Sequence, residues 1–163
     1  MLKRRGLVCL LSFAVISCSL GLAATQDRIT SGLTAATVPL TGQVHRLAQP
    51  QFDQGSVEPG MQMGTITLLT TPTAAQQQAL DQLLAQQQDR KSANYHKWLT
   101  PEQFADRFGL SQSDIAQIVA WLQGEGFTNV HPARGRNWVS FTGNASQVET
   151  AFATEIHRYN VNG

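Results

Sequence analysis

The sequence has 163 residues, with 12 Lys and Arg against 11 Asp and Glu, so its formal net charge is +1. Three of the basic residues are Lys3, Arg4 and Arg5, and the rest of the chain carries a net charge of −2. This balance excludes the strongly basic surfaces of nucleic-acid binders and of proteins that adhere to anionic membranes, so we expect neither as a partner of the mature form.

Residues 1–24 have the pattern of an export signal. A basic start precedes an apolar stretch over residues 7–16, and small residues follow at Gly21, Ala23 and Ala24. The apolar stretch is too short for a stable membrane anchor. We therefore predict a signal peptide over residues 1–24 and a secreted or periplasmic mature protein.

Both cysteines, Cys9 and Cys18, lie within this predicted signal. The mature chain is then without a disulfide, a thiolate metal site or a cysteine nucleophile. Residues 15–18 resemble a bacterial lipobox, in which Cys18 would be lipidated and would attach the mature protein to a membrane. Ordinary signal cleavage is favoured because the first position is Val15 rather than leucine.

Residues 25–59 are rich in Thr, Gly, Ala, Gln and Pro and show no sustained hydrophobic period, so we expect an extended or loosely ordered segment. Residues 61–71 alternate as a strand does, and Pro72 ends it. From residue 73 to 90 the leucine spacing is helical, with glutamines on the opposite face. The sequence therefore predicts a strand followed by an amphipathic helix.

The next predicted helix has both ends marked in the sequence. Thr100 is suited to cap it, Pro101 to begin it, and Gln103 to complete a capping box. Phe104 and Phe108 share one face, and Gly109 predicts a left-handed exit. The acidic side chains of this helix, Glu102 and Asp106, are expected to form a solvated face.

The remaining elements complete a mixed fold. A helix is predicted over residues 111–124, two strands over 127–131 and 137–142, a helix from Asn144, and a strand over 155–160. This order predicts an α+β fold with a ferredoxin-like, four-stranded antiparallel sheet and helices packed on one face. The other face of the sheet is left bare, and such a face is normally covered by something.

The sequence shows no motif of an active site, so we predict no catalytic residue, no metal ligand and no cofactor-binding residue in this chain. Among the large side chains, Trp98 and Trp121 are expected in the core. Trp138 alternates with Val139 and Phe141, so it is expected on the bare face as a binding anchor.

The sequence of residues 95–109 resembles the signature of the pro-kumamolisin activation domain, the propeptide of sedolisin-family serine-carboxyl peptidases. In that family a tyrosine is followed by an aromatic residue, a leucine, Thr-Pro, an acidic or amide residue and a second aromatic residue, as in this chain. Further matching pieces are residues 59–60, 126–127, 135–143, 148–152 and 157–159. The resemblance runs from about residue 57 to residue 160, so we predict the activation domain over residues 60–160, and residues 161–163 would begin a linker.

The resemblance implies an inhibitory propeptide that assists the folding of a secreted, subtilisin-like peptidase domain in cis. The family's Ser-Glu-Asp triad and calcium site belong to that peptidase domain, and none of those residues can be assigned to this chain. We expect a fragment of a longer precursor; the alternative is a freestanding secreted peptidase inhibitor that acts in trans. A ferredoxin-like nucleic-acid binder is disfavoured because Trp138 and Phe141 do not share a face.

Two site predictions follow from the resemblance. Trp138 and Ser140, on the bare face, are the candidate docking residues for the peptidase. His157, near the exit toward the linker, is a candidate pH switch, since a charge on its ring could loosen the last strand. The competing interpretation assigns the pH dependence to carboxylates of the peptidase domain.

Overall fold

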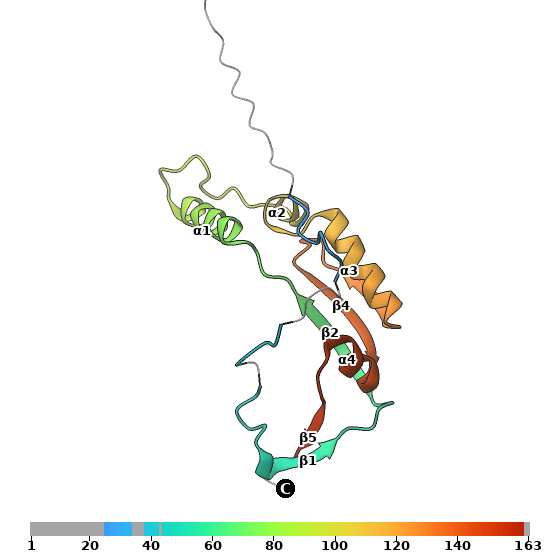
Figure 1. The fold of residues 1–163 in the computed structure, drawn as a ribbon. Coiled ribbons are helices and arrows are strands. Elements are labelled where there is room, and N and C mark those ends of the chain that lie inside the picture. Colours follow the sequence, from blue (N-terminus) through green and yellow to red (C-terminus); the bar gives the residue numbers. More distant parts are fainter. Residues whose placement is uncertain (1–24, 34–37, 43, 162–163) are drawn as a thin grey trace, which may run out of the picture.

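The computed structural model describes residues 25–33, 38–42 and 44–161 (Figure 1). The predicted signal peptide and its Cys18 lie outside the described residues, as do residues 162–163 of the predicted linker. Among the described helices, none combines the length and the apolar content needed to cross a bilayer.

The described residues contain four α-helices and two antiparallel sheets, which confirms the predicted α+β class. The bounds of the helices and strands in chain order are η1 Pro50–Phe52, β1 Asp53–Ser56, β2 Gln62–Leu69, α1 Ala74–Gln88, α2 Pro101–Phe108, α3 Gln112–Gly124, β3 Thr128–Pro132, β4 Trp138–Asn144, α4 Ala145–Phe152 and β5 His157–Tyr159.

The main sheet has three strands in the order β2-β4-β3, all antiparallel. A ferredoxin-like sheet would add the last strand beside β2, and here β5 pairs with β1 in a separate two-stranded ribbon (Figure 1). The predicted four-stranded sheet is therefore not formed. The reason is that the segment expected to be loosely ordered contains β1, whose backbone groups pair with those of β5.

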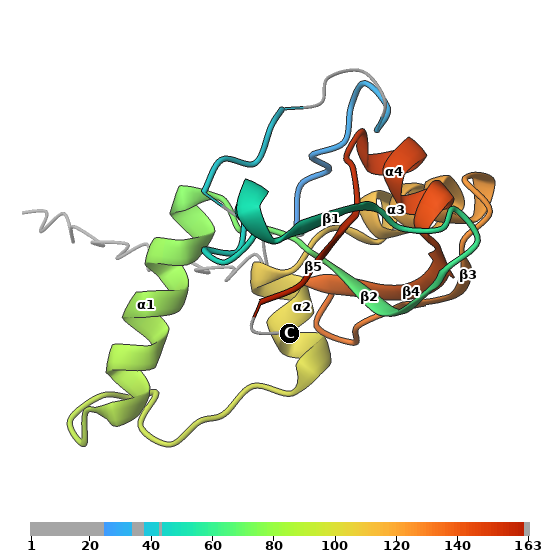
Figure 2. The same ribbon diagram turned by 90° about the horizontal axis from the view of Figure 1, so that it is seen from below.

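The hydrophobic core lies between one face of the main sheet and the helices α3 and α4. Figure 2 shows these two helices side by side above β2 and β4. Val139 and Phe141 of β4 are 0% and 1% exposed, and they pack against Ile118 and Leu122 of α3. The strand period of two thus directs alternate residues of β4 into the core.

Side-chain caps begin the helices as predicted. Thr100 with Gln103 forms a capping box at α2, and Asn144 with Gln147 forms one at α4. The exit of α2 differs from the prediction, because Gly109 has a φ of −78° rather than a left-handed conformation. A glycine is needed there for a different reason: an added Cβ would lie 2.5 Å from the carbonyl oxygen of Gly135.

Candidate functional site

The second face of the main sheet is not covered by any described helix. The strand register places Leu69 beside Trp138, and Thr67 beside Ser140 and His131 on this face. We call Thr67, Leu69, His131, Trp138 and Ser140 the uncovered face. Leu69 is 75% exposed and Trp138 is 38% exposed. Two apolar side chains thus lie exposed side by side where β2 ends and β4 begins, next to the polar side chains of the same face.

Rigid neighbours hold the uncovered face in place. Trp138 and Ser140 flank the buried Val139, so the core fixes the strand that carries both. The carbonyl of Trp138 accepts a hydrogen bond from the N–H of Ala133 at 2.9 Å, which closes the β3–β4 hairpin beside it. The Ser140 hydroxyl donates to the carbonyl of His131 at 3.4 Å. A surface ordered in this way loses little entropy when a partner binds.

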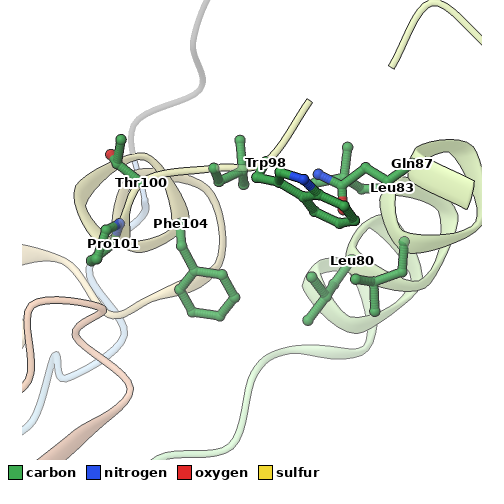
Figure 3. Close-up of a pocket in the computed structure, with 9 residues that line it drawn as sticks. Leu80, Leu83, Gln87, Trp98, Thr100, Pro101 and Phe104 are labelled. Atoms are coloured by element: carbon green, nitrogen blue, oxygen red, sulfur yellow. The ribbon is translucent and has the colours of Figure 1, made fainter. Parts of the chain in front are cut away.

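A second apolar feature is an open groove of about 350 Å³ between α1 and the start of α2. Figure 3 shows the Trp98 ring extending from the segment before α2 toward Leu83 and Gln87 of α1, with Phe104 directed into the same gap. Trp98 is 62% exposed, so its predicted core position is wrong. It lies in this groove because α1 stands apart from the main sheet. Trp121 is half-buried, and it packs edge-on against Phe152.

The ribbon of β1 and β5 brings together three polar side chains. The Asp53 carboxylate lies 2.8 Å from Nδ1 of His157, and the Ser56 hydroxyl lies 3.4 Å from Nε2 of the same ring. The order of contacts is that of a Ser-His-Asp triad. The backbone N–H groups on either side of Ser56 already donate hydrogen bonds within the ribbon. The N–H of Gly55 donates to the Asp53 carboxylate, and that of Val57 donates to the carbonyl of Ile156. Neither of these two N–H groups is free to stabilise an oxyanion.

The pKa values of this cluster move in opposite directions. The N–H of Gly55 and the ring of His157 both donate to Asp53, and they lower the pKa of its carboxyl. The hydrogen bond to Asp53, with the charges of Asp53, Glu155 and Glu149, raises the pKa of His157. Both partners are therefore charged together over a wider pH range than in the unfolded chain.

The contact with Asp53 predicts the opposite sign for the effect of His157. A protonated ring would form an attractive pair with Asp53, so we expect protonation to strengthen the β1–β5 pairing rather than to loosen the last strand. At low pH we expect the pairing to weaken where the Asp53 carboxylate becomes protonated. The role of His157 as a pH switch stays a prediction, now with the opposite direction.

Within the ranges that the structure describes, no three His, Cys, Asp or Glu side chains are placed to hold a metal ion. The uncovered face carries Thr, Ser and His side chains without a carboxylate, so it offers shape and apolar area rather than catalytic chemistry. Its arrangement suits the binding of another protein surface.

The comparison with protein families agrees with this arrangement. The family model of the pro-kumamolisin activation domain matches residues 52–163, which contain both sheets and all four α-helices of the described part of the chain. The chain belongs to this family. As a pro-kumamolisin activation domain it is a propeptide of sedolisin-type peptidase precursors and not their catalytic domain.

Two relatives extend the comparison. Xanthomonalisin of Xanthomonas sp. (strain T-22) is 32% identical over 141 residues, which are 86% of this chain and 17% of that protein. Sedolisin of Pseudomonas sp. (strain 101) is 24% identical over 163 residues, which are 98% of this chain and 28% of that protein. The activation domain therefore spans less than a third of the length of either relative.

The structure places the predicted site residues at two distant points. Trp138 and Ser140 share the uncovered face, whereas His157 lies in the β1–β5 ribbon (Figure 1). The sequence did not lead us to name Leu69 as a site residue. Strand alternation nevertheless places Leu69 on the face opposite to that of Ile66 and Leu68, which is the uncovered face. Nothing in the sequence indicated Asp53, because its contact with His157 joins residues 104 positions apart.

Proposed function

We propose that this activation domain inhibits a sedolisin-type peptidase domain of the same precursor and assists its folding, and that it docks through the uncovered face. The observation that carries the proposal is the pairing of Leu69 with Trp138 on a sheet face that no described helix covers. Exposed apolar side chains on a rigid surface are typical anchors of protein interfaces. Trp138 would be the central anchor, and Ser140 would bind polar groups beside it.

The length of the relatives supports a partner in cis. Xanthomonalisin and sedolisin are sedolisin-family peptidases, and the matched part is a small fraction of each, so a peptidase domain would occupy the remaining length. A covalent link raises the effective concentration of the domain at its docking site to about the millimolar range. A modest interface is then sufficient for inhibition. The predicted signal peptide supports export of the precursor to a secreted or periplasmic location.

Inhibition in trans tests the docking surface. The chain would be added to the isolated peptidase domain encoded with it, and the inhibition constant would be measured for the unchanged chain, Trp138→Ala and Trp98→Ala. We expect Trp138→Ala to weaken inhibition about thirtyfold, the loss typical of an interface anchor. Trp98 is the matched control, because it is an exposed tryptophan in the groove by α1 rather than on the uncovered face.

Thermal unfolding of the same variants separates docking from folding. The proposal expects nearly equal midpoints for the unchanged chain and Trp138→Ala, since an exposed anchor contributes more to binding than to folding. Normal inhibition by Trp138→Ala would contradict docking through this face. Normal peptidase activity in the presence of excess unchanged chain would contradict the inhibitory function itself.

A further inference from the structure

The most deeply buried charged side chain of the described residues belongs to Asp114, near the start of α3. It is 0% exposed, and its carboxylate accepts hydrogen bonds from two consecutive backbone N–H groups of the N-terminal segment. The N–H of Arg28 lies 2.9 Å from Oδ2, and that of Ile29 lies 2.9 Å from Oδ1. Hydrogen bonds to a buried carboxylate are strong, and their loss leaves a charge that is expensive to bury.

Further contacts attach the same segment at other points. The Gln117 amide, one helical turn after Asp114, donates to the carbonyl of Ile29 at 3.3 Å. The Arg28 guanidinium donates to the carbonyl of Thr71, just after β2, at 2.9 Å. The backbone of Ile29 is therefore bound through both its donor and its acceptor, much as a strand would be bound by a neighbouring strand.

Apolar contacts complete this attachment. Ile29 and Leu33 are half-buried and pack against the core that contains Ile118, Leu122 and Phe141. They supply a part of the core that none of the helices or strands contributes. The hydrogen bonds to Asp114 join residues about 85 positions apart, so the attachment of this segment is a tertiary contact and not a local one.

We propose that Asp114 and Gln117 form a peptide-binding site on α3, that residues 28–33 occupy it, and that cutting the chain between this segment and β1 destabilises the whole domain. The site recognises an extended backbone with two consecutive free N–H groups, followed by apolar side chains. In the intact chain the segment is held at a high effective concentration, and a cut converts the same contact into a weak bimolecular one.

The described residues of the connection between the segment and β1 are open to a protease. Among them, Val38, Leu40 and Val44 are 77%, 80% and 76% exposed. The proposal therefore adds a second place, far from the end of β5, at which proteolysis would weaken the domain. It does not depend on the docking surface, because it concerns the folding of the chain alone.

Limited trypsin digestion of the full chain tests whether the segment is bound. Arg28 and Arg46 both have exposed side chains, but only the backbone at Arg28 is held by Asp114. Cleavage after Arg28 should be at least about tenfold slower than cleavage after Arg46, since it requires local opening. Asp114→Asn should remove most of this protection. Asp27→Asn is the matched control, because it makes the same change on an exposed neighbour, and it should leave the protection intact.

Two measurements keep the test valid if Asp114→Asn fails to fold. In the unchanged chain, the amides of residues 28 and 29 should exchange with solvent more slowly than that of Val44. A second chain would carry a specific protease site inserted after Leu40. Before cutting, its melting temperature should not depend on protein concentration; after cutting, its melting temperature should fall when the protein is diluted. Equal trypsin rates at Arg28 and Arg46, or a cut chain that loses the segment without any change in melting temperature, would overturn the proposal.

Discussion

Gly109, at the end of α2, lies between the last turn of its own helix and the backbone of the β3–β4 connection. An added Cβ there would be 2.5 Å from the carbonyl oxygen of Gly135 and 2.9 Å from that of Ala105. Both neighbours are backbone atoms, so neither can move aside as a flexible side chain would. The identity of this residue is therefore set by close packing rather than by an unusual φ.

We expect Gly109→Ala to lower the free energy of unfolding by about 1–3 kcal/mol, the usual cost of overpacking. Gly124→Ala is the matched control, because an added Cβ at Gly124 would meet nothing within 4 Å. It lies at the end of α3, where alanine should be neutral or stabilising by about 0.5 kcal/mol. Urea unfolding of both variants measures the difference, and equal stabilities would contradict the packing argument.

His157 and Asp53 give the β1–β5 ribbon a defined pH dependence. The raised pKa of His157 means that its contribution is complete below its ordinary pKa and is lost as the pH rises through the raised value. The lowered pKa of Asp53 means that its contribution is present above its ordinary pKa and is lost as the pH falls through the lowered value. The ribbon should be most stable in the mildly acidic range between them.

We expect His157→Gln to abolish the gain in ribbon stability between weakly alkaline and mildly acidic pH. Hydrogen exchange at the amide of Asn160, which donates to the carbonyl of Phe52 at the end of the ribbon, measures this locally. The unchanged chain should show slower exchange on mild acidification once the intrinsic pH effect is subtracted. Faster exchange would restore the original prediction that a charge on His157 loosens the last strand.

At the scale of elements, two arginines attach the β3–β4 hairpin to α2. Arg136 donates from Nη2 to Asp106 and from Nε to the carbonyl of Leu110, both at 2.7 Å. Arg134 donates to Glu102, also at 2.7 Å, but both of these side chains are largely exposed. The carboxylates expected to form a solvated face of α2 therefore bind the hairpin.

We expect Arg136→Ala to destabilise the domain by about 1–3 kcal/mol, because it removes a half-buried donor from a backbone carbonyl and from a carboxylate. Arg134→Ala should change stability little, since exposed ion pairs are screened by solvent. Chemical unfolding of both variants and of the double variant checks this order. A larger loss for Arg134→Ala would contradict it.

The predictability of the elements follows from the range of the interactions that form them. Thr100 with Gln103 and Asn144 with Gln147 are capping pairs three residues apart, so the sequence alone indicates where α2 and α4 begin. The exposure of Trp138 follows from strand alternation. By contrast, the pairing of β5 with β1 and the contact of Asp114 with Arg28 join distant residues, and no local pattern indicates them.

At the scale of the whole molecule, the position of α1 explains why Trp98 does not lie in the core as predicted. Figure 2 shows the far end of α1 on the side away from α3 and α4. The apolar row of this helix therefore faces the groove with Trp98 rather than the main core. A helical period identifies which residues share a face, but it does not identify what that face contacts.

Whether the Ser56-His157-Asp53 cluster can perform chemistry depends on the structure around it, not on these three side chains alone. Catalysis by such a triad requires a donor pair that stabilises the oxyanion and a cleft that positions the substrate. Here the flanking N–H groups of Gly55 and Val57 are used within the ribbon. Ser56 is also 3.4 Å from Nε2 of His157, a weak contact for proton transfer.

We therefore predict that the domain by itself does not hydrolyse denatured protein at any pH from acidic to neutral, and that it hydrolyses an activated ester such as p-nitrophenyl acetate no faster than free imidazole at the concentration of its four histidines, His45, His96, His131 and His157. Ser56→Ala should leave the ester rate unchanged, because isolated imidazole groups alone account for such weak catalysis. Progress curves with both substrates, measured on protein purified without any peptidase domain, test this. Turnover that disappears in Ser56→Ala and persists in Ser140→Ala would show instead that the ribbon is an active site, and the domain would then be an enzyme as well as a propeptide.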